Sequence, residues 1–317
     1  VNYLGAYADI NVQLNKPEKA IELVKKIITI EGTSIESFIQ LGVLYNDLEK
    51  DNEAIKIFQE VLKQDSTHAA GLHFLSTSYR ENEEYEKAQV YADKMTIAYP
   101  ENPQGSINSA LIALEQDDSE KAINILSPIA AEFPEEYSVH YLLGMSYNLL
   151  ESYKMAAVYL DNARQIAPHS RNTLHLLAIV NDNLNNWTIT DGIYQQLIMT
   201  DSTDAQAFNN YAYSLIERGE KVELSKKYSR RAIELAPDQA AYLDTYGWIL
   251  FKMGDTKKAH KYINKSLEID NENAEVLEHM GDILVKMNKK TQAKEFYQKA
   301  LLFDPENQQL IEKLSDF

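Results

Sequence analysis

Apolar residues recur along the chain at the three- and four-residue spacing of an α-helix, as at Leu243, Tyr246 and Leu250. The stretch from Tyr246 to Ala259, YGWILFKMGDTKKA, indicates the end of one helix, a short turn and the start of a second helix. The sequence contains neither a strand-like alternation of apolar and polar residues nor a hairpin signal. The pattern therefore predicts an all-α chain built from pairs of helices.

Small residues mark a repeat of 34 residues. One series, near the start of each second helix, consists of Ala20, Ala54, Ala88, Ala122, Ala156, Thr190, Ser225, Ala259 and Ala293. The step from Thr190 to Ser225 is 35 residues, and we assign the extra residue to an insertion near Glu220. A second series lies twelve residues upstream, or thirteen in the unit with the insertion, and consists of Ala8, Gly42, Ser76, Ala110, Gly144, Ala178, Ala212, Gly247 and Gly281. Two helices can cross closely only where the contact point lacks bulk. Close packing therefore offsets the cost of a glycine inside a helix, about 1 kcal/mol relative to alanine. Thr190 and Ser225 depart from the first series, and we expect looser packing there.

The repeat divides residues 1–307 into nine units, with boundaries at 1–34, 35–68, 69–102, 103–136, 137–170, 171–204, 205–239, 240–273 and 274–307. Prolines recur where the second helix of a unit is expected to stop, at Pro100, Pro134, Pro168, Pro237 and Pro305. The last segment has Leu310, Ile311, Leu314 and Phe317 at helical spacing. It predicts a capping helix over 308–317 that covers the apolar side of the last unit.

The small-residue pair and the terminal proline, carried for example by Gly144, Ala156 and Pro168, resemble the tetratricopeptide repeat (TPR) family over essentially the whole chain. The resemblance implies a right-handed α-solenoid, or superhelix, of antiparallel helix pairs. Residues 209–254 are more specifically similar to bacterial TPR proteins. Many such relatives are exported or lipid-anchored, which slightly favours the bacterial periplasm or outer membrane over the cytoplasm.

The charge of the chain restricts its partners. The formal net charge is -17, which argues against a protein that binds nucleic acid by neutralising phosphates. Residues 35–136 contain 20 acidic and 7 basic residues, whereas residues 205–307 contain 16 of each. No apolar run approaches the roughly 18 residues that a membrane-spanning helix needs. The chain begins at Val1 without a basic-then-apolar leader, so we expect a mature protein or a piece of a longer one.

The sequence offers no motif for catalysis or for binding a metal. Its seven histidines are scattered without metal-ligand spacing, and there is no cysteine. Neither a glycine-rich phosphate loop nor a nucleophile motif occurs. We therefore expect no catalytic residue, no cofactor and no metal, and a chain that is not an enzyme.

A groove lined by the first helices is the expected partner site. Asp244, Trp248 and Phe251 are spaced by four and three, so they share the stripe next to the packing stripe, on the concave side. Apolar and aromatic residues are expected to line the groove, at Tyr141, Met145, Leu149, Ile179, Tyr213, Ile216, Trp248 and Phe251. Acidic residues mark its C-terminal end, at Asp244, Glu275, Glu278 and Asp282. For Trp248 the alternative is that neighbouring first helices bury the ring.

The groove predicts a non-catalytic scaffold or adaptor. Its residues fit an apolar peptide or an amphipathic helix that carries basic residues for the acidic end. The Lys and Asn with which some TPR domains hold the carboxylate tail of Hsp70 or Hsp90 are missing from the matching positions. We expect membrane contact only through a partner or an anchor outside this sequence. Two other functions stay open: a regulatory or substrate-recruiting array of a larger enzyme or envelope complex, and a structural solenoid that self-associates.

Overall fold

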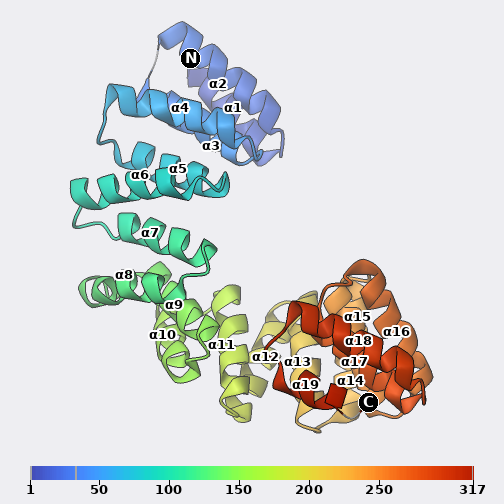
Figure 1. Cartoon of the computed structure of the whole chain (residues 1–317). Helices are drawn as coiled ribbons and strands as arrows, with labels where there is room; N and C mark the ends of the chain where they lie inside the picture. Colours follow the sequence, from blue (N-terminus) through green and yellow to red (C-terminus); the bar gives the residue numbers. More distant parts are fainter. Residues whose placement is uncertain (1, 33, 316) are drawn as a thin grey trace. The chain divides into compact units, whose positions relative to one another are not determined.

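A computed structural model describes residues 2–32, 34–315 and 317, and this part of the chain forms nineteen α-helices (Figure 1). Their bounds are α1 Asn2–Gln13, α2 Pro17–Glu31, α3 Ile35–Asn46, α4 Asp51–Gln64, α5 Ala69–Glu81, α6 Tyr85–Ala98, α7 Gln104–Glu115, α8 Ser119–Glu132, α9 Tyr137–Leu149, α10 Tyr153–Ile166, α11 Arg171–Asn183, α12 Trp187–Thr200, α13 Ala205–Glu217, α14 Val222–Leu235, α15 Ala240–Lys252, α16 Thr256–Ile269, α17 Ala274–Lys286, α18 Lys290–Phe303 and α19 Gln308–Ser315. Consecutive helices form antiparallel pairs, which confirms the predicted all-α fold class. Within each pair the odd-numbered helix is the first helix.

The helices fall into two compact units, Val1–Pro168 with α1 to α10 and His169–Phe317 with α11 to α19. We call them the N-terminal unit and the C-terminal unit. The division lies between two helix pairs, and the sequence repeat does not predict it. None of the helices in the described part of the chain is long and apolar enough to cross a membrane.

Glycines of the upstream small-residue series lie directly against the second helix of their pair. A Cβ atom added to Gly247 would lie 2.7 Å from Cδ1 of Ile263 and 3.2 Å from its backbone nitrogen. A Cβ atom added to Gly144 would lie 2.5 Å from Cγ of Leu160. Both partner side chains are fully buried, so neither has free space to move into. The structure thus confirms that the small residues allow close helix crossings.

The two departures from the small-residue series are buried like the alanines that they replace. The side chains of Thr190 and Ser225 are fully buried. Oγ of Ser225 donates a hydrogen bond to the backbone oxygen of Ala212 on the paired helix at 2.8 Å. Ser76 donates in the same way to Ala88 at 2.9 Å. At Ser225 the hydroxyl thus bonds across the crossing where alanine only fits. The expectation of looser packing in these two units stays a prediction.

The turn inside each helix pair places one residue in the left-handed region at the same point of the repeat. The turn before α14 contains a second left-handed residue, Lys221, with φ 45°. The residues at the repeated point, with φ between 54° and 86°, are Asn15, Glu49, Glu83, Asp117, Glu151, Asn185, Gly219, Gly254 and Asn288. Most are Asn, Asp or Gly, which adopt this conformation most readily. The turn between α13 and α14 has four residues, 218–221, whereas the turn between α15 and α16 has three, 253–255. The inserted residue therefore lies in the turn before α14.

Asp204 connects successive pairs in the C-terminal unit. Its carboxylate accepts hydrogen bonds from the backbone N–H of Ala207, from the Arg171 guanidinium and from Nε2 of His175, at 2.8 to 2.9 Å. Burial alone would raise the pKa of Asp204, but these hydrogen bonds outweigh burial and hold the pKa well below its usual range. Asp204 thus caps α13 and joins it to α11.

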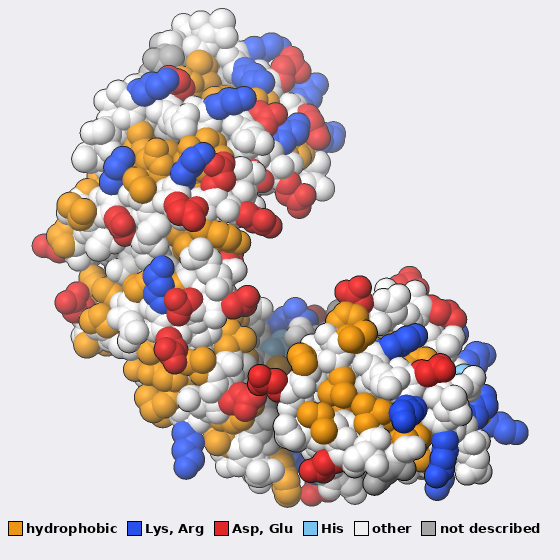
Figure 2. Space-filling view, viewed as in Figure 1, with side chains coloured by type: hydrophobic (Ala, Val, Ile, Leu, Met, Phe, Trp, Pro, Cys, Tyr) orange, Lys and Arg blue, Asp and Glu red, His pale blue; other side chains and the backbone are white. Residues whose placement is uncertain are grey.

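The last helix closes the C-terminal unit. Leu310 of α19 is fully buried in the core formed with α16, α17 and α18, and Leu314 is partly buried there. Nζ of Lys313 donates to the carboxylates of Glu278 and Asp282 on α17 at 2.7 to 2.8 Å. The contact of α19 with the last helix pair is therefore both apolar and ionic. On the outer side of this unit, Lys and Arg side chains gather along α16 (Figure 2).

Candidate partner-binding pocket

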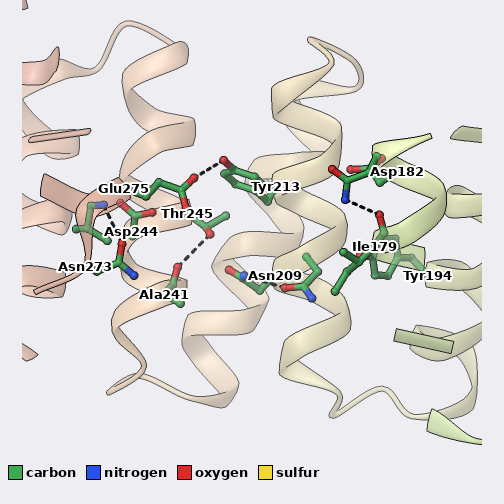
Figure 3. A pocket seen from close by; sticks show the side chains of 13 residues that line it. Ile179, Asp182, Tyr194, Asn209, Tyr213, Ala241, Asp244, Thr245, Asn273 and Glu275 are labelled. Carbon is green, nitrogen blue, oxygen red and sulfur yellow. Dashed lines mark hydrogen bonds between the residues drawn. The ribbon is translucent and has the colours of Figure 1, made fainter. Parts of the chain in front are cut away.

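A cavity of about 350 Å³ opens among α11, α13, α15 and α17, the first helices of four consecutive pairs (Figure 3). Its lining consists of Ile179, Asp182, Asn183, Tyr194, Asn209, Asn210, Tyr213, Ala241, Asp244, Thr245, Asn273, Glu275 and Val276. We call it the first-helix pocket. All of these residues except Tyr194 and Asn273 belong to first helices, because the 34-residue repeat returns the same helix face in every pair.

Two carboxylates of the pocket, Asp182 and Glu275, are weakly balanced: Asp182 has no ion-pair partner among the described residues, and Glu275 lies 4.0 Å from Nε2 of His279. Asp182 is partly buried and accepts a hydrogen bond from Oγ of Ser214 at 2.7 Å. Burial raises the pKa of Asp182 above its usual value, although the Ser214 hydrogen bond opposes this shift. Glu275 is exposed, and its carboxylate accepts a hydrogen bond from the hydroxyl of Tyr213. Burial and the Glu275 charge both raise the pKa of Tyr213, so this phenol remains a donor.

The third carboxylate, Asp244, is buried and balanced by a histidine from the next pair. Nδ1 of His279 donates to Oδ1 of Asp244 at 2.9 Å. Burial alone would lower the pKa of His279, but the attraction of Asp244 and the hydrogen bond to it raise the pKa above its ordinary value. The imidazole also stacks on the Trp248 ring, with 3.9 Å between the ring centroids. A protonated His279 is thus favoured by both neighbours.

Trp248 belongs to the core of the C-terminal unit. Its side chain is 7% exposed, stacks on Phe251 as well as on His279, and donates from Nε1 to Glu217 at 2.7 Å. Ile216 is buried in the same apolar cluster, and Phe251 is partly buried against it. The alternative left open by the sequence therefore holds for Trp248: the neighbouring first helix buries its ring.

The structure brings four of the predicted site residues together and separates others. Ile179, Tyr213, Asp244 and Glu275 line the first-helix pocket. Glu278 and Asp282, expected at an open acidic end, are instead paired with Lys313 of α19. The carboxylates of Glu278 and Asp282 are therefore not free, contrary to the predicted open acidic end. Only Glu275 and Asp244 of its four members face the pocket.

The remaining predicted residues lie on α9 in the N-terminal unit. Tyr141 and Met145 are partly buried against the apolar core of α7, α8 and α9. The Tyr141 ring stacks on Tyr137, with 5.8 Å between the centroids, and Leu149 is exposed. These residues form an apolar strip within their own unit. A groove that continues through both units stays a prediction.

The side-chain amide of Asn209, which lines the pocket, has a hydrogen-bond partner for its nitrogen but none for its oxygen among the described residues. Asn209 is 6% exposed, and its Nδ2 donates to Oδ1 of Asn210 at 3.3 Å. Its own Oδ1 is buried and has no hydrogen-bond partner among the residues that the structure places. A buried acceptor without a donor costs about 1–3 kcal/mol. Figure 3 shows this carboxamide beside Ala241 and Thr245, between α13 and α15.

Sequence reasoning missed Asp182, Tyr194 and Asn209 as pocket residues. The consecutive Asn209 and Asn210 were the available signal, since asparagine is unfavourable in the middle of an apolar helix. Within residues 2–32, 34–315 and 317, no group of three or more His, Asp or Glu side chains is arranged to hold a metal ion. The pocket therefore offers acceptors and apolar walls and can bind a group by hydrogen bonds and charge.

Comparisons with known protein families agree with this architecture. Two family models described as "Tetratricopeptide repeat" match residues 35–68 and 250–314. The chain contains tetratricopeptide repeats. A third model, described as "AimR transcriptional regulator-like", matches residues 134–229 of this TPR protein. None of these three models describes an enzyme.

Individual relatives are distant. The TPR protein is 23% identical over 211 residues to the BBSome complex member BBS4 of Bos taurus, a match that covers 67% of this chain and 41% of BBS4. Its fold is similar to a chain in the crystal structure of the APC/C hetero-tetramer Cut9-Hcn1, with a TM-score of 0.65, 14% identity and coverage of 95% of this chain and 59% of the other. It is also similar to a thermophilic TPR protein of Thermus thermophilus, with a TM-score of 0.52, 17% identity and coverage of 57% and 98%. The chain thus spans less than two thirds of the length of the first two relatives. These identities show the fold alone.

Proposed function

We propose that this TPR protein is a non-catalytic scaffold or adaptor that binds a peptide or helix of a partner protein on its first helices. The first-helix pocket carries the proposal, because it is a preformed cavity that the chain's own side chains leave unfilled. Two relatives support it, since one is a member of the BBSome complex and the other belongs to the APC/C hetero-tetramer Cut9-Hcn1. We further propose the nine units at their predicted boundaries, the cap over 308–317 and the bacterial type.

The composition of the pocket is that of a binding site. Ligand pockets of about 300–1,000 Å³ combine apolar walls with a few polar groups that fix orientation. Ile179, Val276 and the Tyr213 ring supply apolar surface, and Asp182 and Glu275 supply polar groups. A partner helix would insert one or two anchor side chains here, while the neighbouring first helices contact the rest of it.

A bulky substitution at the rim tests the proposal without disturbing the core. Ala241 lines the pocket and is exposed, so Ala241→Arg fills the entrance from the surface of α15. Thr188→Arg is the control, because Thr188 is exposed on α12 and is not part of the pocket lining. Proteins that co-purify with the wild type should be lost with Ala241→Arg and retained with Thr188→Arg. Identical co-purification with both variants, each folded by circular dichroism, would reject the pocket as the partner site.

The AimR-like match favours a second candidate, a regulatory array within a larger protein or complex. The matched residues 134–229 cover α9 to α13 and part of α14, which are repeat helices like the others. The match therefore adds no element outside the repeat architecture. Sequencing the complete reading frame distinguishes the candidates: a fused catalytic or DNA-binding module favours the regulatory array, and a reading frame of repeats alone favours the scaffold.

A further inference from the structure

The described lining of the first-helix pocket is acidic, with three carboxylates, Asp182, Asp244 and Glu275. Asp182 and Glu275 carry negative charge, and the described residues of the lining include no Lys or Arg. Arg218, whose charge also acts on Asp182, is held by an ion pair with Asp191. The third carboxylate, Asp244, is already paired with His279. Asp182 thus has no ion-pair partner among the described residues, and a single histidine, His279, serves both Asp244 at 2.9 Å and Glu275 at 4.0 Å. The pocket therefore holds more negative charge than its described surroundings balance.

An independent observation points to the same kind of ligand. Oδ1 of Asn209 is a buried acceptor for which the described part of the chain provides no donor, and its side chain lines the pocket from α13. An N–H or O–H group is the partner that this atom lacks. The missing group is therefore a donor, which agrees with the charge of Asp182 and Glu275.

We infer that the first-helix pocket binds the arginine side chain of a partner peptide. This inference rests on the proposed function and specifies its ligand. A guanidinium carries five N–H donors in one plane, so it can serve acceptors on several helices at once. The apolar part of an arginine side chain packs on walls such as Ile179, Val276 and the Tyr213 ring. An ammonium group is a compact charge with three donors and matches the separated acceptors less well.

The affinity for a minimal ligand tests the inference. N-acetyl-arginine amide is titrated into the full chain, and the amide resonances of α13 and α17 are followed by NMR. N-acetyl-citrulline amide is the control, because citrulline has nearly the same shape and no charge. We expect the arginine probe to bind about tenfold or more tightly than the citrulline probe, since a hydrogen bond to a charged group contributes about 1.5–3 kcal/mol. The lysine analogue should bind more weakly than the arginine probe.

Substitutions locate the site. Asp182→Asn and Glu275→Gln should each weaken binding of the arginine probe about tenfold. Glu223→Gln, the matched control, removes the same charge from an exposed position of α14 and should leave binding unchanged. Glu275 is exposed, so its substitution should preserve the fold even if that of Asp182 does not.

Three results would overturn the arginine assignment. They are no binding up to the solubility limit of the probe, equal binding of citrulline or lysine probes, and equal binding by Glu275→Gln and the wild type. The co-purification experiment with Ala241→Arg is independent of these probes. If Ala241→Arg loses partners while the arginine probe fails to bind, the scaffold function stands and only the ligand assignment is wrong. If neither experiment detects binding, both are wrong.

Discussion

Replacing a crossing glycine by alanine should destabilise the C-terminal unit relative to the same change elsewhere in that unit. A Cβ atom at Gly247 would lie 2.7 Å from Cδ1, 2.9 Å from Cγ1 and 3.2 Å from the backbone nitrogen of Ile263. Ile263 is fully buried, and a β-branched side chain has little rotamer freedom in a helix. The two helices must therefore move apart. Gly192, also inside a helix of this unit, has nothing within 4 Å of an added Cβ atom in the described structure.

The comparison of the two variants isolates the packing contribution. Both substitutions gain helix propensity, about 1 kcal/mol for glycine to alanine. Gly247→Ala also overpacks the crossing, at a cost of about 1–3 kcal/mol. We therefore expect Gly192→Ala to raise the free energy of unfolding by about 1 kcal/mol. Gly247→Ala should lie about 1–3 kcal/mol below Gly192→Ala, because the propensity gain is common to both.

Urea unfolding followed by tryptophan fluorescence measures this difference. The sequence contains two tryptophans, Trp187 and Trp248, and both lie in the C-terminal unit, so the signal reports that unit alone. Equal stabilisation by Gly247→Ala and Gly192→Ala would refute the reasoning. It would mean that the crossing accepts a methyl group without cost and that the small-residue series has another cause.

Three further predictions concern buried groups of the C-terminal unit. The pKa of His279 is raised in the folded state, so its contribution to stability is complete below its unfolded pKa of about 6.5 and is lost as the pH rises through the folded pKa. Urea unfolding between neutral and alkaline pH should show this loss of stability. His279→Gln should make the free energy of unfolding less dependent on pH over the same range. The pKa of Asp204 is lowered in the folded state, so its carboxylate stabilises the fold at neutral pH. Asp204→Asn, which preserves a capping side chain, should lower the free energy of unfolding by about 1–2 kcal/mol at neutral pH. The difference between variant and wild type should shrink as the pH falls below about 4. Trp248→Ala should lower the free energy of unfolding by about 3–5 kcal/mol in circular dichroism melts, and a loss below about 1 kcal/mol would contradict the burial of its ring.

The fold could be predicted from the sequence because its determinants recur. One glycine in a helix has several explanations, but Gly42, Gly144, Gly247 and Gly281 at one point of a 34-residue repeat have a common one. In the structure each of the four lies against the side chain sixteen residues later, on the paired helix. The division into two compact units could not be predicted in this way, because a regular repeat gives no signal for where contacts between pairs become sparse.

The candidate site could be predicted only in part, because its burial depends on neighbouring pairs. Helical spacing correctly placed Tyr213 and Asp244 on the first helices, and both line the pocket. The burial of Trp248, however, depends on His279, which lies 31 residues further along the chain and on the next first helix. Likewise, Glu278 forms an ion pair with Lys313 of the last helix. The pattern within one helix does not contain these contacts.

Photo-crosslinking from the pocket rim tests the central claim most directly. A photoreactive phenylalanine analogue is placed at position 241, at the pocket, or at position 188, on exposed α12. The cross-linked partner peptides are then sequenced. The scaffold proposal predicts that one partner segment, with apolar residues and an arginine, cross-links from position 241 and not from position 188. Efficient cross-linking from position 188 with none from position 241 would contradict partner binding on the first helices.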